Sequence, residues 1–153
     1  MRKETLQGFV HDEASAFFGG LAGNAGLFST ARDVARVYQM LLNGGEIDGQ
    51  RYLSKETCQL FTTETSKISR RGLGFDKPDA DDPKKGNCAP AAPAEVYGHT
   101  GFTGTCAWVD PMNELVYVFL SNRIYPDVTN RKLNQLHIRE RIQGAIYDAM
   151  KKK

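Results

Sequence analysis

The segment LVYVFLS, residues 115–121, constrains the fold more than any other stretch of this chain. Its apolar residues fall at both odd and even positions, whereas a strand with one solvent-facing side alternates between apolar and polar residues. A short strand that is apolar on both sides is typical of the middle of a sheet covered on both faces. We therefore expect 115–121 to be a central strand covered on both faces.

Two further strands are predicted just before this one. They are EVYGHTGF, near residues 95–102, and CAWVD, residues 106–110. The turn DPMNE joins the second of them to 115–121 as a hairpin. An antiparallel sheet of these three strands leaves one edge of 115–121 without a neighbour. We expect either an additional strand to pair there or that edge to support self-association.

The first predicted helix begins at a capping box formed by Thr30 and Asp33. It ends before Gly44 and Gly45, because glycine readily takes the left-handed conformation that closes a helix. Helical spacing of the apolar residues indicates one buried side. That stripe consists of Val34, Val37, Tyr38, Leu41 and Leu42.

A second helix is predicted from Ser54, whose hydroxyl suits the N-cap position, with Cys58 and Phe61 facing the core. GLGF, residues 72–75, is expected to form a short strand. A terminal helix is predicted over about residues 130–150. The apolar stripe of this terminal helix consists of Ile138, Ile142, Ala145, Ile146 and Ala149. Helices followed by antiparallel strands and a terminal helix predict an α+β fold with helices packed on the sheet.

The chain of 153 residues suits one domain. Residues 10–66 are predicted to be a helical region, although residues 17–28 are expected to be irregular and packed, because repeated glycine is costly inside a helix. Residues 67–96 carry four of the six prolines and a cluster of charges, which favours a surface loop. Residues 97–153 then hold the strands and the terminal helix.

Charge and composition exclude several classes of protein. The 20 Lys and Arg against 18 Asp and Glu give a net charge of +2, too small to indicate binding to nucleic acid or to a membrane surface. No apolar run is long enough for a transmembrane segment. Cys58, Cys88 and Cys106 lack paired spacing, so we expect free thiols rather than a disulfide framework or a zinc site.

GHTGFTG, residues 98–104, is the strongest candidate for a functional site. His99 can exchange a proton near neutral pH, Thr100 can hydrogen-bond a substrate, and Gly101 lets a ligand approach the backbone. The backbone N–H of Phe102 would then face a developing oxyanion. A glycine-rich hairpin with an incidental histidine explains the same residues, so both interpretations stand at this point.

Other patterns carry less chemistry. A Cys106–His99 pair is a rival nucleophile and base, but Cys106 lies in an apolar run typical of a buried, inert thiol. The glycines of residues 19–26 match no phosphate-binding motif, so we interpret them as packing and capping. His11 and His137 are interpreted as surface or satisfied histidines. The chain contains no GxSxG, Ser-x-x-Lys, Tyr-x-Asn or Ser-x-Asn. It therefore holds half of a possible active site and no obvious attacking group.

Three segments nevertheless follow one another in a familiar order: GGLAGNAGLFSTARDVARVYQMLLNGG, then GLGF, then GHTGFTGTCAWVDPMNELVYVFLSNR. This order resembles the C-terminal part of the serine β-lactamase-like family, which includes class C β-lactamases, penicillin-binding proteins, D-aminopeptidases and esterases. The resemblance runs from about Val10 to the terminal helix. It implies part of a β-lactamase-like fold and an acyl-serine mechanism on amide, β-lactam or ester bonds, with no metal or organic cofactor.

The family's third motif, Lys-Thr-Gly or His-Thr-Gly, lies on a strand beside the cleft. His99, Thr100 and Gly101 match it, so the resemblance gives them catalytic positions. It places Phe102 and Thr103 on the substrate and oxyanion side. The first motif, Ser-x-x-Lys, and the second, Tyr-x-Asn or Ser-x-Asn, precede the third in the family and are absent here. We therefore expect a C-terminal fragment of one β-lactamase-like domain that is inactive alone.

Two functions remain open for the parent protein. The first is a serine hydrolase with a small-molecule or peptidoglycan-like substrate, for which the resemblance implies a periplasmic or exported location in a bacterium. The second is a catalytically dead binding or interaction module appended to another enzyme, such as a glycoside hydrolase. Intact first and second motifs upstream would favour the enzyme, and their loss would favour the module.

Overall fold

A computed structural model describes residues 5–63 and 66–151 of the chain. The chain divides into two compact units, one ending at Thr30 and the other beginning at Ala31, and each is described by itself. Among the described residues, no helix has both the length and the apolar composition that a membrane crossing requires.

The first unit holds one short helix, α1 (Glu13–Phe17). Asp12 caps this helix by accepting a hydrogen bond from the Ser15 backbone N–H at 2.7 Å, and the Asn24 amide donates to the same carboxylate at 3.2 Å. Residues 18–28 are irregular, as predicted. The prediction that residues 17–28 are packed is wrong, because so small a unit has too little side-chain volume to cover its own apolar groups. The exposed side chains are Phe17, Phe18, Leu21, Leu27 and Phe28.

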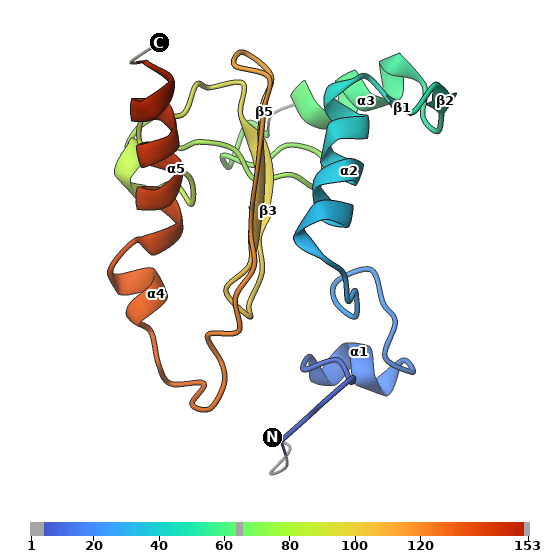
Figure 1. The fold of residues 1–153 in the computed structure, drawn as a ribbon, viewed down its shortest axis with the longest axis vertical. Coiled ribbons are helices and arrows are strands. Elements are labelled where there is room, and N and C mark those ends of the chain that lie inside the picture. The colour runs from blue at the N-terminus through green and yellow to red at the C-terminus, as the bar shows by residue number, and fades with distance from the viewer. Residues whose placement is uncertain (1–4, 64–65, 152–153) are drawn as a thin grey trace. The chain divides into compact units, whose positions relative to one another are not determined.

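The second unit is built on a three-stranded antiparallel sheet in the order β3-β4-β5, which is seen edge-on in Figure 1. The strands are β3 (Tyr97–Thr100), β4 (Cys106–Asp110) and β5 (Leu115–Phe119). Each lies within a stretch that was predicted as a strand. Together with the helices beside them, these strands confirm the α+β class.

In the described part of the chain the 115–121 strand is not central, and its edge lacks a neighbour, as the three predicted strands alone would leave it. The central strand is β4, and all five of its residues are buried. β5 is an edge strand in which only Tyr117 is fully buried. A strand pattern that is apolar on both sides indicates that both faces of the sheet are covered. It does not indicate whether the strand has a hydrogen-bonded neighbour on each edge. Self-association through the free edge of β5 stays a prediction.

Helices lie on both faces of this sheet (Figure 1). On one face, α2 (Ala31–Leu42) contacts β4 and β5. It begins directly after Thr30 and ends shortly before Gly44, in agreement with the sequence. Val37 was assigned to its buried stripe but is 55% exposed, so the covered side of the helix is narrower than predicted.

The next helix, α3 (Lys55–Thr63), begins where Ser54 predicted it, because the Ser54 hydroxyl accepts a hydrogen bond from the Thr57 backbone N–H at 3.1 Å. Cys58 is buried as expected. The assignment of Phe61 to the core is wrong, since that side chain is 45% exposed. The single buried residue of this helix shows that it touches the core through one turn only.

A small hairpin between α2 and α3 was not predicted. It consists of β1 (Glu46–Ile47) and β2 (Gln50–Arg51). Its two-residue turn is Asp48-Gly49, and both residues have positive φ, 52° and 75°. Asp-Gly is the dipeptide that suits such a turn, so the sequence did carry a signal for this hairpin.

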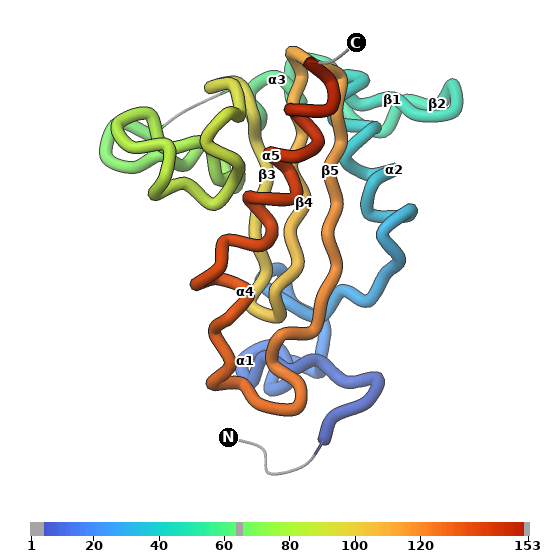
Figure 2. Tube along the Cα trace, turned by 60° about the vertical axis from the view of Figure 1, so that its left-hand side comes forward, coloured from blue at the N-terminus to red at the C-terminus, as the bar shows by residue number. Residues whose placement is uncertain are grey.

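The terminal helix is interrupted. α4 (Lys132–Gln135) is followed by His137 in the left-handed conformation, with φ 49°, and then by α5 (Ile138–Met150). α5 lies against the face of the sheet opposite α2, in front of β3 and β4 in Figure 2. The predicted single helix over 130–150 is therefore two helices, because the left-handed residue ends the first before the second begins.

α5 faces the sheet with a side other than the predicted apolar stripe. Ile146 packs against the core, but Ile142, Ala145 and Ala149 are exposed. The buried residues of α5 are Arg139, Glu140, Gln143 and Tyr147. Hydrogen bonds to the rest of the unit determine this orientation. They run from Tyr117 Oη to Arg139 O (3.1 Å), from Ala89 N to Gln143 Oε1 (2.8 Å) and from Tyr147 Oη to Asp110 Oδ2 (2.8 Å).

Candidate functional site

His99 lies on the α2 face of the sheet. Tyr97, two residues earlier on the same strand, packs against Phe75 with ring centroids 5.2 Å apart, and Phe75 packs against Tyr38 of α2 at 6.3 Å. Because side chains alternate along a strand, Tyr97 and His99 share this face while Thr100 points to the α5 face. The His-Thr pair of the predicted motif is therefore divided between the two sides of β3.

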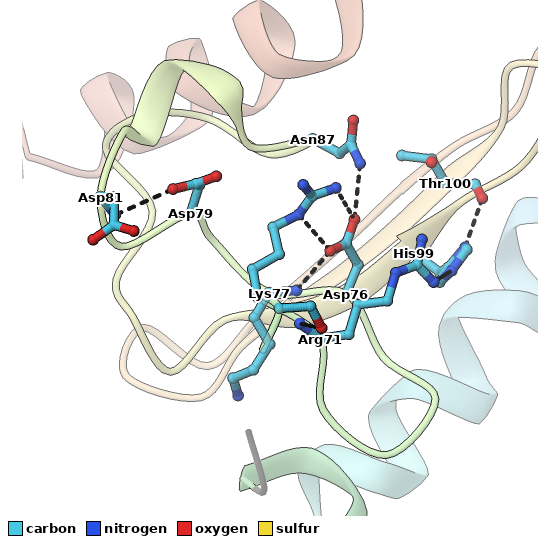
Figure 3. Close-up of polar contacts among 10 residues, drawn as sticks. Arg71, Asp76, Lys77, Asp79, Asp81, Asn87, His99 and Thr100 are labelled. Atoms are coloured by element: carbon cyan, nitrogen blue, oxygen red, sulfur yellow. Dashed lines mark hydrogen bonds and ion pairs between the residues drawn. The ribbon is translucent and has the colours of Figure 1, made fainter. Parts of the chain in front are cut away.

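The imidazole of His99 has two polar neighbours (Figure 3). Its Nδ1 lies 2.7 Å from the Thr100 carbonyl oxygen, and its Nε2 lies 2.9 Å from Nη1 of Arg71. Arg71 comes from the loop that precedes β3 and is 28 positions away in the sequence. The sequence analysis missed it, because no spacing rule connects residues so far apart.

Gly101 has a structural reason to be glycine. A Cβ atom at this position would lie 2.3 Å from Oγ1 of Thr105, across the turn that joins β3 to β4. The backbone N–H of Gly101 also donates to the Thr105 carbonyl oxygen at 2.8 Å. Closure of the turn accounts for the glycine, and a ligand at its backbone remains a proposal.

Phe102 and Thr103 lie in this turn, which is fastened to the segment after β5. The guanidinium of Arg123 lies over the Phe102 ring, 4.7 Å from its centroid. The Arg123 backbone N–H donates to the Thr103 carbonyl oxygen at 2.9 Å. A cation over an aromatic ring and a backbone hydrogen bond together restrain the turn that follows the predicted motif.

A shallow depression of about 330 Å³ lies beside this turn but includes none of the five predicted site residues. Arg123 connects the two, because it lines the depression and also stacks on Phe102. The depression is lined by Ser121, Asn122, Arg123, Tyr125, Asn130, Lys132, Leu133, Leu136 and Ile138. Among the residues that the structure describes, no three His, Cys, Asp or Glu side chains converge as metal ligands do.

Asp76 anchors the loop before β3 (Figure 3). Its carboxylate is 1% exposed and accepts from Arg70 Nε at 2.7 Å, from Arg70 Nη2 at 3.0 Å and from Asn87 Nδ2 at 2.8 Å. Burial by itself raises the pKa of the Asp76 carboxyl, but the hydrogen bonds from Arg70 and Asn87 outweigh it and leave the pKa below its ordinary value. This loop anchor was also missed by the sequence analysis.

The same residue joins the loop to β3. The Asp76 backbone N–H donates to the Gly98 carbonyl oxygen at 2.8 Å, and the Gly98 N–H donates back at 3.1 Å. The prediction of a strand at 72–75 is wrong, because these residues form no strand. The one-residue bridge at Asp76 comes directly after them. Gly74, with φ 96°, belongs to the turn that delivers Asp76 to the sheet.

The Cys106–His99 pair is excluded by geometry. Cys106 pairs with Thr100 across β3 and β4, whereas His99 pairs with Ala107. Directly paired residues point to the same face, so the Cys106 thiol and the His99 ring lie on opposite sides of the sheet. Burial also raises the pKa of the Cys106 thiol to about 11, which leaves it protonated at neutral pH.

All three cysteines, Cys58, Cys88 and Cys106, are free and buried. We expect none of them to react with the thiol reagent DTNB within minutes at neutral pH in the folded chain, because only an accessible thiolate attacks. All three are expected to react at once in denaturant. Rapid labelling of any one of them in the folded chain, measured by absorbance and mass spectrometry, would contradict the buried positions.

Comparison with known proteins adds to this geometry. A family model described as Beta-lactamase matches residues 3–140. The chain is 36% identical over 135 residues to a putative D-alanyl-D-alanine carboxypeptidase of Escherichia coli (strain K12), covering 88% of this chain and 31% of that protein. A protein of the same description from Salmonella typhi gives the same values. The crystal structure of a penicillin-binding protein homolog from Caulobacter crescentus matches with a TM-score of 0.46 and 26% identity, over 58% of this chain and 24% of that one.

The family model covers most of the chain, so the chain belongs to the β-lactamase family, a family of serine hydrolases. The resemblance noted in the sequence is thereby confirmed. The chain spans about a third of the length of the curated relatives that it matches. The activity, substrate and partners of a whole protein therefore enter only as proposals.

Proposed function

We propose that this chain forms one wall of the active site of a serine hydrolase that cleaves an amide bond beside a D-amino acid, as in peptidoglycan peptides. The observation that carries the proposal is the His99-Thr100-Gly101 motif at the end of β3, in a chain that belongs to the β-lactamase family. The carboxypeptidase description of the curated relatives supports a peptidoglycan-type substrate.

Each predicted site residue has a role in this proposal. His99 borders the cleft from the α2 face of β3, and Thr100, the last residue of that strand, binds the substrate where the strand ends. The backbone N–H of Phe102 faces the oxyanion of the tetrahedral intermediate, where fixed donors are most effective. Thr103 lies beside it on the substrate side. The turn restraints from Arg123 support this arrangement, because they hold the backbone of residues 102–103 in place.

The attacking group comes from elsewhere in this proposal. The 153 residues contain no Ser-x-x-Lys, so the nucleophilic serine belongs to residues that are not among them. The edge of β5 that has no strand partner among the described residues is where additional strands, from the same protein or from a second copy, would extend the sheet. The chain by itself is then inactive.

A direct experiment compares the chain with a chimera. The chimera carries the 135 matching residues of this chain in place of their counterparts in the E. coli relative, and that relative, unmodified, is the reference. We expect the chain alone to release no D-alanine from a D-alanyl-D-alanine peptide and to bind no fluorescent penicillin. The chimera is expected to do both.

His99→Ala in the chimera is expected to lower kcat/KM about 10²-fold, as for the loss of one preorganised polar group beside the cleft. Circular dichroism checks that the variant is folded. Turnover by the isolated chain would contradict the proposal that the nucleophilic serine lies outside these residues. A folded chimera that binds no penicillin, beside a reference that does, would instead favour a binding module without catalytic activity.

A further inference from the structure

We propose that Arg71 is a positioning residue for His99, fixing its imidazole in the tautomer with the proton on Nδ1, and that Arg71 itself carries the permanent positive charge beside the motif. The catalytic meaning of this inference rests on the proposed function, but the hydrogen-bonding state of His99 does not. Figure 3 shows the two side chains together, with Thr100 on the far side of the imidazole.

The donors and acceptors determine the tautomer. A guanidinium has only N–H donors, so Nε2 of His99, 2.9 Å from Arg71 Nη1, must accept with its lone pair. The Thr100 carbonyl oxygen can only accept, so Nδ1, 2.7 Å away, must carry the proton. A doubly protonated ring would direct an N–H at the guanidinium, where two donors and two positive charges would meet. The arrangement therefore requires a neutral Nδ1–H imidazole.

Arg71 is held in place through its own carbonyl group and through the side chain of the residue before it. Its carbonyl oxygen accepts from the Ser66 N–H at 2.7 Å. The preceding residue, Arg70, forms a two-point ion pair with buried Asp76. Asp76 in turn pairs through its backbone with Gly98, the residue before His99. The loop thus places Arg71 against His99 through a continuous set of contacts rather than through one long, independent side chain.

This arrangement changes the part that His99 plays. A lysine at the first position of the third motif carries charge on the strand itself, but here the charge lies on the loop. His99 connects that charge to Thr100, since its ring bonds Arg71 on one side and the Thr100 carbonyl on the other. While the contact persists, Nε2 has no proton to donate. We therefore assign His99 an orienting role rather than that of a general acid acting through Nε2.

The test is a spectroscopic measurement on the 153-residue chain itself. Long-range ¹H–¹⁵N correlation spectra of the histidine rings identify which nitrogen carries the proton. They are recorded about two pH units above the ordinary imidazole pKa of about 6.5. The His99 signals are assigned by their loss in His99→Asn. The wild type is expected to show a protonated Nδ1 and an unprotonated, hydrogen-bonded Nε2. A proton on Nε2 in the wild type would overturn the proposal without any variant.

Variants show whether Arg71 is the cause. In Arg71→Ala the Nε2 signal is expected to shift to the higher frequency of a free lone pair, because its donor is lost. In Arg71→Lys the Nε2 signal is expected to return part of the way to its wild-type frequency, since an ammonium also donates a hydrogen bond. Arg141→Ala, on the exposed side of α5, is the matched control and is expected to leave the His99 signals unchanged. Identical Nε2 signals in the wild type and Arg71→Ala would refute the contact.

A second readout separates this proposal from the function on which it rests. In the chimera, Arg71→Ala is expected to lower kcat/KM about 10²-fold, as for the loss of one preorganised charge, with partial recovery in Arg71→Lys. If the spectra follow the expectation but kcat/KM does not change, the hydrogen-bonded arrangement stands and its catalytic meaning falls. If the spectra fail, the positioning role falls whatever the activity of the chimera.

Discussion

Replacing Gly98 by alanine is expected to destabilise the chain by about 3 kcal/mol or more, at the upper end of what overpacking usually costs. A Cβ at Gly98 would lie 2.1 Å from the Ala107 carbonyl oxygen and 2.8 Å from Cα of Trp108. Both are main-chain atoms of β4, so no rotation of a side chain relieves the overlap. β3 and β4 would have to separate, which breaks their hydrogen bonds as well.

Urea denaturation followed by circular dichroism measures this loss. The matched control is Gly144→Ala, the same substitution within α5, where the nearest atom to the new Cβ is the Ala89 Cβ at 4.0 Å. That variant is expected to be neutral or more stable by up to about 1 kcal/mol, because alanine favours a helix over glycine. Equal stabilities for the two variants would show that β3 and β4 are farther apart than described.

Asp76→Asn is expected to destabilise the chain by about 3 kcal/mol at neutral pH, the lower end of the cost of breaking a buried ion pair. The substitution keeps the size of the side chain but removes the charge that pairs with Arg70 at 2.7 Å. The amide N–H₂ of the new asparagine would also face donors from Arg70 or Asn87. The loop anchor at β3 is the part of the structure expected to loosen first.

The pH dependence has a definite sign. The folded-state pKa of Asp76 lies below its unfolded value, so the stabilisation is complete above the unfolded pKa of about 3.9 and is lost as the pH falls through the lower folded value. The stability difference between wild type and Asp76→Asn should therefore shrink below about pH 4. Urea midpoints measured from pH 7 downward give this difference directly.

Asp148→Asn is the control for this experiment. Asp148 and Lys151 form a surface pair with 3.9 Å between the charged atoms, and their side chains are 74% and 69% exposed. Such exposed pairs contribute little to stability, so this variant is expected to match the wild type at every pH. A loss in Asp76→Asn no greater than that in Asp148→Asn would mean that the Asp76–Arg70 pair does not hold the loop.

Local features of the sequence predicted the elements of the fold but not their burial. The Ser54 cap, the glycines after α2 and the apolar run of β4 depend on neighbours within a few positions, so they can be read in the sequence. Whether Phe61 or Val37 is covered depends on distant parts of the chain. For α5, buried hydrogen bonds outweighed an apolar stripe that periodicity alone had favoured.

The candidate site shows the same limit. The sequence and a family resemblance identified His99-Thr100-Gly101, and their catalytic roles stay predictions. Neither could identify Arg71 or Asp76, because loop residues become neighbours of a strand only when the chain folds back through the Asp76–Gly98 bridge. The positive charge of Arg71 beside the motif can therefore be identified from the folded structure but not from the sequence.

The three hydrogen bonds of α5 have a consequence for how the helix is located along the sheet. Apolar contact is non-directional and allows two surfaces to slide, whereas a hydrogen bond weakens steeply when its atoms move apart. The bonded positions 139, 143 and 147 are four residues apart. A slide by one helical turn, about 5.4 Å, would separate the Gln143 and Tyr147 side chains from Ala89 and Asp110 together. α5 therefore has one longitudinal position on the sheet, specified by polar atoms within its interface.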